Sequence, residues 1–300
     1  MSAGVRLLVR RKRWGEDERA VARRARRLFG APSPFAWLRT LGVRVRQVND
    51  RSHGVSVRGE WIEPERADEG DGVIFYIHGG GYVACSAATH RPLTAALARL
   101  ARRRVFSLDY RLAPEHRYPA ALDDAVAAYG WLLTREGVPA SAISFVGDSA
   151  GGGLVLSSLL RVRDARVPLP ACAVCFSPWT DLAGAGESQR SNDGLCAMFR
   201  TENAAEFAPA YLGDASPLDP YASPAYADLA GLPPILLQVG STELLLDDAR
   251  RVHHKIQEAK GSSRLEIYAD VAHGWQMLDG FVPEARAALR QAASFINEHV

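Results

Sequence analysis

Short apolar runs, separated by segments of helical pattern, constrain the fold of this 300-residue chain more than any other feature. A run such as "VIFYI" at 73–77 has no polar alternation, which is typical of a strand buried on both faces. Parallel strands need crossover connections, which are usually helices. The pattern therefore predicts an α/β fold, with a mostly parallel central sheet and helices on both faces. The apolar runs lie at 73–77, 104–110, 142–147, 171–177, 234–240 and 265–270, and the helix-like segments at 89–102, 119–135, 150–165, 242–260 and 283–298.

Two parts of the chain depart from this rhythm. Residues 41–50 and 55–64 alternate apolar and polar side chains, which predicts an antiparallel pair at one edge of the sheet. Residues 183–228 are longer than a simple crossover. We interpret 185–213 as an inserted helical segment that packs with residues 1–40, so that the two form a small helical cap on the main domain at 41–300.

The charge balance argues against nucleic acid as a partner. The chain carries 36 Lys and Arg against 34 Asp and Glu, a net charge of +2. Residues 1–30 concentrate ten basic side chains, which we interpret as the solvated face of a helix rather than a docking arm. No apolar run approaches the roughly 20 residues that span a bilayer. We therefore expect a cytoplasmic protein without stable membrane insertion.

The cysteines predict neither a disulfide framework nor a metal centre. Four cysteines are too few for a disulfide scaffold at this length. Cys172 and Cys175 lie in an apolar run of strand type, where residues three apart face opposite ways. No second pair of cysteines or histidines stands at metal-binding spacing. Core cysteines and no bound metal are the expectation.

The stretch "SFVGDSAGGGL" at 144–154 places a serine where an apolar strand turns into a helix. Gly147 and Gly151 lack Cβ atoms, so the two backbones can approach closely and Ser149 is held at a sharp, exposed corner. The amide of Ala150 then lies at the positive end of the helix, where it can donate to a developing oxyanion. A serine hydroxyl becomes a nucleophile at neutral pH only with a base and an acid that orients the base.

A second glycine-rich turn follows the strand at 73–77. His78 is succeeded by three glycines, whose backbone can turn its amides toward a ligand. Because this turn and the serine corner both follow strands, they are expected at the same edge of the sheet. We expect Gly79 and Gly80 to donate to an oxyanion together with Ala150.

The base and the acid should stand on later loops at the same edge. His273 follows the apolar run at 265–270 and precedes the last helix, whereas the other histidines lie in helices, at the terminus or in other motifs. Glu243 is the carboxylate nearest the end of the strand at 234–240, and Asp247, one helical turn later, is the alternative acid. The order serine, acid, histidine is that of enzymes with a nucleophile elbow.

Several longer motifs resemble those of the hormone-sensitive-lipase-like bacterial carboxylesterases, a group of the α/β-hydrolase superfamily marked by an HGGG turn. The resemblance covers about residues 73–280, in the expected order. It implies an α/β-hydrolase fold with a helical cap, and a catalytic domain at 41–300. The matching motifs are "HGGGYV" (78–83), "DYRLAPEHRYPAALDD" (109–124), "GDSAGG" (147–152), "SPWTDL" (177–182), "VGSTELLLDD" (239–248) and "AHGW" (272–275).

The resemblance also implies roles for individual residues. Ser149 becomes the nucleophile, Glu243 the acid and His273 the base of a serine esterase that hydrolyses small-molecule esters with short to medium acyl chains. The family needs no metal or cofactor. Its members suggest a homodimer that forms through the strand near 265–270 and the last helix.

The chain departs from the family pattern at positions that shape the substrate pocket. Cys85 stands where the family often has glycine, and Glu243 where many members have aspartate. The cap segments match least, and the cap residues Trp14, Trp37, Met198, Phe199 and Phe207 are expected to set the pocket's shape. The charges of the motif at 109–124 are interpreted as structural. The residues predicted to bind substrate are Tyr82, Cys85, Trp179, Met198 and Phe199.

Other functions fit parts of the same pattern. A hydrolase of N-acetyl amides or lactones would use the same three side chains, and the sequence does not rank it against an esterase. A non-catalytic ligand-binding module on the same scaffold is also a hypothesis. Receptors of that kind have lost the catalytic histidine, whereas Ser149, Glu243 and His273 are all present here.

Overall fold

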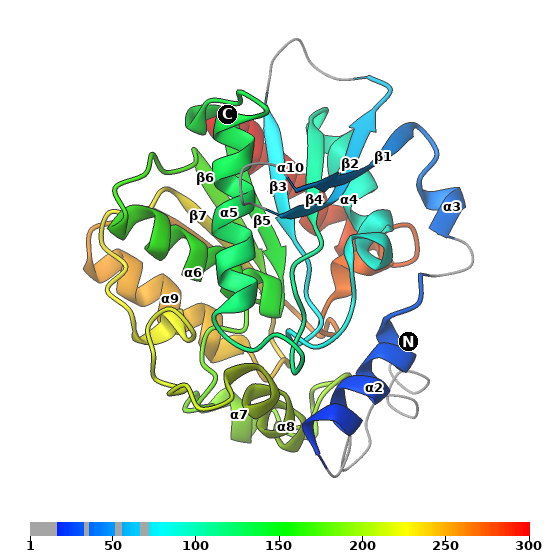
Figure 1. The fold of residues 1–300 in the computed structure, drawn as a ribbon. Coiled ribbons are helices and arrows are strands. Elements are labelled where there is room, and N and C mark those ends of the chain that lie inside the picture. The colour runs from blue at the N-terminus through cyan, green and yellow to red at the C-terminus, as the bar shows by residue number, and fades with distance from the viewer. Residues whose placement is uncertain (1–16, 33–35, 52–55, 67–71) are drawn as a thin grey trace.

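An eight-stranded sheet forms the centre of the molecule (Figure 1). The computed structural model describes residues 17–32, 36–51, 56–66 and 72–300. The strand order in the sheet is β1-β2-β4-β3-β5-β6-β7-β8. The strands are β1 Val43–Asp50, β2 Val57–Pro64, β3 Val73–Ile77, β4 Arg104–Leu108, β5 Ile143–Asp148, β6 Cys172–Phe176, β7 Ile235–Gly240 and β8 Ser263–Tyr268.

Pairing within the sheet is parallel from β4 through β8. β3 lies between β4 and β5 and pairs in parallel with both, and the parallel register continues through β6 and β7 to β8. β1 pairs antiparallel with β2, and β2 pairs antiparallel with β4. The predicted mostly parallel sheet with an antiparallel pair at one edge is therefore confirmed.

Alternate residues of the central strands feed two separate cores. In β3, Phe75 packs in one core with side chains of α5, α6 and α9, while Tyr76 packs in the other with side chains of α4 and α10. Because successive side chains of a strand point to opposite faces, a strand covered on both sides is apolar throughout. The helices are α4 Ala87–Ala101, α5 Ala120–Thr134, α6 Ala150–Asp164, α9 Leu246–Glu258 and α10 Pro283–His299.

One predicted helix begins later than expected. The helical pattern at 242–260 predicted a start just after β7, but α9 starts at Leu246. The side chain of Glu243 folds back to accept a hydrogen bond from the Gly240 amide, at 2.6 Å. This contact holds the residues between β7 and α9 in a loop, so the prediction of helix from 242 was wrong.

Helices from both segments of the predicted cap, 1–40 and 185–213, lie together at one end of the sheet (Figure 1). α2 (Glu18–Phe29) packs against α8 (Thr201–Leu212), and the short α7 (Ser188–Ser191) lies nearby. The short α3 (Ala36–Arg39) packs instead against α4. Residues 1–16, with Trp14 and the first five basic side chains, lie outside the described residues, and so does the side chain of Trp37.

Ion pairs fix α2 to the segment that carries the "APEHRYP" motif. Arg26 forms an ion pair with Glu115, at 2.6 Å, and also donates to the carbonyls of Val83 and Ala113. Arg117 pairs with Glu18 at the start of α2. The charges of this motif therefore include those that join α2 to the main domain, in agreement with their structural interpretation.

Cys172 and Cys175 are buried in β6, as expected for core residues. All four cysteines are free. Among the described helices, none is long and apolar enough to cross a membrane. The same described residues contain no group of three or more His, Cys, Asp or Glu side chains that could hold a metal ion.

The close approach of α6 to β3 generates a prediction about stability. A Cβ atom on Gly151 would lie 2.1 Å from the carbonyl oxygen of Ile77 and 2.5 Å from that of His78. Both obstacles are backbone atoms, so Gly151→Ala should lower the free energy of unfolding by about 3 kcal/mol or more. Urea unfolding at neutral pH measures the loss.

The matched control is Gly130 in α5, where an added Cβ would meet nothing within 4 Å. Gly130→Ala should raise the free energy of unfolding by about 0.5–1 kcal/mol, because alanine restricts the unfolded chain. Equal effects of the two substitutions would contradict the packing argument.

Candidate active site

Ser149 occupies the corner between β5 and α6 in a conformation that is unusual for a side-chain-bearing residue. Its backbone angles are φ 54° and ψ −122°. Two hydrogen bonds hold it there: the Ser149 amide donates to the Phe176 carbonyl, and the Trp179 amide donates to the Ser149 carbonyl, each at 2.8 Å. The last residue of β6 and the loop after it therefore hold the corner through these two hydrogen bonds. The surroundings of Ser149 thus impose its strained backbone conformation.

The three side chains predicted from separate parts of the chain come together in one line. Ser149 Oγ lies 2.9 Å from His273 Nε2, and His273 Nδ1 lies 2.5 Å from Glu243 Oε2. His273 is 6% exposed and Glu243 is 1% exposed. A hydroxyl, an imidazole and a carboxylate in this order can pass a proton from the hydroxyl to the imidazole.

The electrostatics of His273 favour proton uptake. Burial opposes a charge on the imidazole, but the Glu243 carboxylate outweighs it, so the pKa of His273 is raised above its ordinary value. Asp148 adds to the effect from further away. An imidazolium formed on His273 is therefore stabilised by the site.

Glu243 is held by residues that sequence reasoning did not identify. The Ser177 hydroxyl donates to Glu243 Oε1 at 2.7 Å, and the Asn192 side chain donates to the Glu243 carbonyl at 2.8 Å. Ser177 has a positive φ of 44° and is 1% exposed. The motif "SPWTDL" contained the signal, since a serine directly after a buried strand lies at the same sheet edge as Ser149.

Asp247, the alternative acid, points to other partners. Its Oδ2 accepts from the Ser188 amide at 2.8 Å, and its Oδ1 pairs with Arg250 at 3.3 Å. Glu243 is the carboxylate that contacts His273. The structure therefore favours Glu243 over Asp247 as the partner of the imidazole.

The glycine turn after β3 gives its first amide to a carboxylate. The Gly79 amide donates to Asp148 Oδ1 at 2.8 Å. Within the described residues, no hydrogen bond is donated by the amides of Gly80, Gly81 and Ala150. Gly80 and Gly81 both have positive φ, 112° and 62°. The expectation that Gly79 and Gly80 supply the free donors of this turn is therefore revised to Gly80 and Gly81.

Asp148 is the centre of a buried polar cluster beneath this turn. Besides Gly79, it accepts from the Tyr76 hydroxyl at 2.6 Å and lies 3.4 Å from His90 Nε2. Burial alone would raise the pKa of this carboxyl, but His90, Tyr76 and the Gly79 amide lower it to about 2. The pKa of His90 is raised because Asp148 outweighs the effect of its burial. Sequence reasoning gave His90 no role.

His78 is stacked and hydrogen-bonded within the glycine turn. Its ring stacks on Tyr110 with centroids 4.3 Å apart, and its Nδ1 lies 2.7 Å from the Gly79 carbonyl. Burial and the neighbouring His90 lower the pKa of His78 to about 3, so it is neutral at physiological pH. The stacking on Tyr110 and the contact with Gly79 fix His78 beside the glycine turn.

The predicted substrate-binding residues lie in three places. Tyr82 is buried with its ring stacked on Tyr211 of α8 at 3.7 Å, and Trp179 is 5% exposed. The ring of Phe199 lies edge-on to His273 at 5.3 Å, and Met198 precedes it in the same loop. Cys85 is half-buried, with its thiol 3.6 Å from the Phe29 carbonyl of α2. Phe199 is thus placed beside the imidazole, while Tyr82 joins the glycine turn to α8.

Known proteins are similar to this chain over most of its length. A family model described as the alpha/beta hydrolase fold matches residues 74–277. An acetyl-hydrolase of Streptomyces hygroscopicus is 42% identical over 237 residues, which cover 79% of this chain and 78% of the relative. An esterase of Acinetobacter venetianus is 38% identical over 240 residues, which cover 80% of this chain and 78% of that protein.

Solved structures extend the similarity to nearly the whole chain. The crystal structure of an esterase from the bacterial hormone-sensitive lipase family superposes with a TM-score of 0.86 at 38% identity, and covers 99% of this chain and 97% of that one. An esterase/lipase from an uncultured bacterium gives a TM-score of 0.88 at 34% identity, with 99% and 96% covered.

The low pKa of Asp148 generates a prediction about pH and stability. A carboxyl whose pKa falls from 3.8 to about 2 on folding stabilises the fold above the higher value and loses that effect as the pH falls through the lower one. Asp148→Asn keeps the shape but not the charge, so it should lower the free energy of unfolding by about 2 kcal/mol at pH 7 and by about half as much at pH 3. Urea unfolding at several pH values measures the difference.

The control for this experiment is Glu258→Gln, which neutralises an exposed carboxylate at the end of α9. It should change the free energy of unfolding by less than about 0.5 kcal/mol, as is usual for an exposed surface substitution. If the loss caused by Asp148→Asn were the same at pH 3 as at pH 7, the charge of Asp148 would not be its source.

Proposed function

Because the chain belongs to the α/β-hydrolase family, among the bacterial esterases of the hormone-sensitive lipase group, and is a carboxylic ester hydrolase, we propose that it cleaves short- to medium-chain acyl esters through Ser149, His273 and Glu243. The observation that carries the proposal is the line of contacts from Ser149 Oγ to His273 and on to Glu243. The strained backbone of Ser149 supports it further, since strain of this kind gathers at functional sites.

The proposed reaction proceeds through an acyl-enzyme. His273 Nε2 takes the proton of Ser149 as its oxygen attacks the ester carbonyl carbon, and the carbonyl oxygen becomes an oxyanion. The imidazolium, paired with Glu243, then returns the proton to the departing alcohol as the C–O bond breaks. Water attacks the acyl-enzyme by the same route, and Ser149 is regenerated with release of the carboxylic acid.

We propose that the amides of Gly80, Gly81 and Ala150 stabilise the oxyanion. Preorganised amide donors in a partly buried site are worth more than the same donors in water, because they need not reorient during the reaction. The Gly79 amide, which donates to Asp148, serves instead to fix the turn. Support comes from the positive φ angles of Gly80 and Gly81, which turn the backbone out of the strand direction.

The segments α2 and α8 are proposed to be the cap that shapes the substrate pocket. α8 lies against the glycine turn: a Cβ on Gly81 would come within 3.2 Å of the Phe207 ring, and Tyr82 stacks on Tyr211. Phe199, from the loop before α8, borders His273. These contacts bring bulky side chains close to the reacting groups, which supports short over long acyl chains.

Two further expectations remain proposals. An N-acetyl amide or lactone could be cleaved by the same three side chains, and the name acetyl-hydrolase of the Streptomyces relative supports an acetyl group as one acyl portion. A homodimer through β8 and α10 is supported by the position of β8 at the edge of the sheet, where Ile267 is 43% exposed.

Removing the nucleophile tests the proposed function directly. Ser149→Ala should reduce the turnover of p-nitrophenyl acetate and butyrate on the order of 10⁴-fold or more, because among the described residues Ser149 supplies the hydroxyl that contacts His273 Nε2. Steady-state rates on esters of two to twelve acyl carbons, with N-acetyl amides beside them, also rank the candidate substrates. Unchanged ester hydrolysis by a folded Ser149→Ala protein would overturn the proposal.

Exchanging the two candidate acids separately tests the role of Glu243. Glu243→Gln should lower kcat on the order of 10²- to 10⁴-fold, since the amide no longer stabilises the imidazolium. Asp247→Asn, the matched control in the same segment, should change kcat by about threefold or less, because Asp247 contacts Ser188 and Arg250. A larger loss in the Asp247 variant would assign the acid to that residue.

A further inference from the structure

The loop after β6 contacts both ends of the proposed catalytic line. Its first residue, Ser177, donates its hydroxyl to Glu243 Oε1 at 2.7 Å. Two residues later, the amide of Trp179 donates to the Ser149 carbonyl at 2.8 Å. The position of this loop is therefore linked both to that of Glu243, the proposed acid, and to that of Ser149, the proposed nucleophile.

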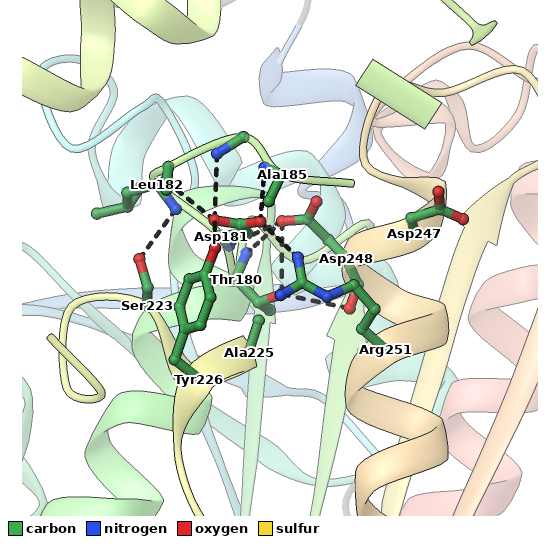
Figure 2. Close-up of polar contacts among 12 residues, drawn as sticks. Thr180, Asp181, Leu182, Ala185, Ser223, Ala225, Tyr226, Asp247, Asp248 and Arg251 are labelled. Atoms are coloured by element: carbon green, nitrogen blue, oxygen red, sulfur yellow. Dashed lines mark hydrogen bonds and ion pairs between the residues drawn. The ribbon is translucent and has the colours of Figure 1, made fainter. Parts of the chain in front are cut away.

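A buried carboxylate holds the same loop from the opposite side. Asp248 lies in the first turn of α9, and its Oδ1 accepts from the amides of Thr180 and Asp181 at 2.7 and 2.9 Å. The Thr180 hydroxyl donates to the Asp248 carbonyl at 3.3 Å. Figure 2 shows Asp248 projecting from α9 toward the chain at Thr180 and Asp181. Asp248 is fully buried.

The cationic side chain nearest Asp248, that of Arg251, pairs with the neighbouring carboxylate of Asp181 instead. Arg251 donates to Asp181 Oδ2 at 2.5 Å, and the Tyr226 hydroxyl donates to Asp181 Oδ1 at 3.0 Å (Figure 2). The amides of residues 183–185 complete the shell of Asp181. Among the described residues, Asp248 Oδ2 has no hydrogen-bond partner. One oxygen of Asp248 thus supports the loop, while the other is buried without a donor.

We propose that Asp248 is a positioning residue for the reaction: through Thr180 and Asp181 it holds the β6 loop so that Ser177 stays on Glu243 and Trp179 stays on Ser149. This inference rests on the proposed function. The contacts form a closed ring, because Asp248 and Glu243 belong to the same segment and Glu243 returns through His273 to Ser149. A shift of α9 against the loop would move the acid and the nucleophile apart.

The charged and titratable groups that face Asp248 come from three elements. They are Asp181 on the β6 loop, Arg251 on α9 itself and Tyr82 on the glycine turn, with Tyr226 beyond Asp181. Burial, followed by the nearby Asp181, raises the pKa of Asp248 to about 7. The protonated form has the shape of asparagine, so Asp248→Asn preserves the acceptor Oδ1 and removes the titration.

Kinetics on p-nitrophenyl butyrate test the proposal. Asp248→Ala deletes the acceptor and should lower kcat about tenfold or more with KM changed less than about threefold, because the acid is displaced and the pocket is not. Asp248→Asn should restore kcat to within about threefold of the parent. If Asp248→Ala does not fold, Asp248→Leu keeps the volume without the acceptor and should show the same loss.

A control variant separates positioning from stability. Ile256→Ala removes a buried side chain near the other end of α9, so it should lower the melting temperature without changing kcat below the transition. If Asp248→Ala lowered the melting temperature as Ile256→Ala does and left kcat unchanged, Asp248 would be merely structural and the proposal would be overturned.

Coupling to Ser177 gives the decisive comparison. If Asp248 acts through the β6 loop, the double variant Asp248→Ala with Ser177→Ala should lose no more kcat than the worse single variant. Losses that multiply would overturn the proposal. Ser149→Ala in the same assay keeps the two claims apart: activity without Ser149 contradicts the proposed function, whereas unchanged kcat in Asp248→Ala beside an inactive Ser149→Ala contradicts this inference alone.

The titration of Asp248 adds a readout that does not depend on activity. A carboxyl with a raised pKa in the folded state stabilises it at low pH, and that effect is lost as the pH rises through about 7. The melting temperature of Asp248→Asn relative to the parent should therefore increase between pH 5 and pH 9. A constant difference over this range would show that Asp248 carries a fixed charge and would contradict its assignment as an acid that is neutral below pH 7.

Discussion

The buried carboxylate of Glu243 joins the loops that follow three neighbouring strands. Its Oε1 accepts from the Ser177 hydroxyl after β6 and from the Gly240 amide at the end of β7, and its Oε2 contacts His273 after β8. A carboxylate that is 1% exposed is tolerable only when donors surround it. The position of the imidazole beside Ser149 therefore depends on loops that one side chain fixes relative to one another.

Much of this arrangement could be predicted because burial and strand order leave direct marks in the sequence. β3 is apolar throughout since it feeds a core on each face, and strands covered in that way cannot alternate. The corner at Ser149 leaves a mark in the sequence because positions 147 and 151 accept only glycine. A Cβ at either position would collide with a backbone carbonyl. Parallel strands place their carboxyl ends at one edge, so Ser149 and His273 were expected to meet there.

The donors around these groups could not be predicted, because side chains distant in sequence decide them. Nothing near Gly79 shows that its amide is engaged: the acceptor is Asp148, 69 residues later. The same holds for Ser177 and Glu243, which are 66 residues apart. The start of α9 was misplaced for a related reason, since the Glu243 side chain folds back onto the Gly240 amide. A helical pattern shows the spacing of the apolar residues. It does not show that a carboxylate such as that of Glu243 accepts a hydrogen bond from the preceding strand and delays the start of the helix.

Asp148 and Asp248 are both buried aspartates, but their pKa values shift in opposite directions. Burial raises the pKa of any carboxyl, but His90 and further donors lower that of Asp148 to about 2. Arg251 donates its hydrogen bond to Asp181 instead, and the pKa of Asp248 rises to about 7. The glycine turn is therefore held by an acceptor that stays charged in the folded protein until the pH falls toward its pKa of about 2. The β6 loop is held by an oxygen that accepts two amides whether or not its carboxyl is protonated, so its support does not require a buried charge.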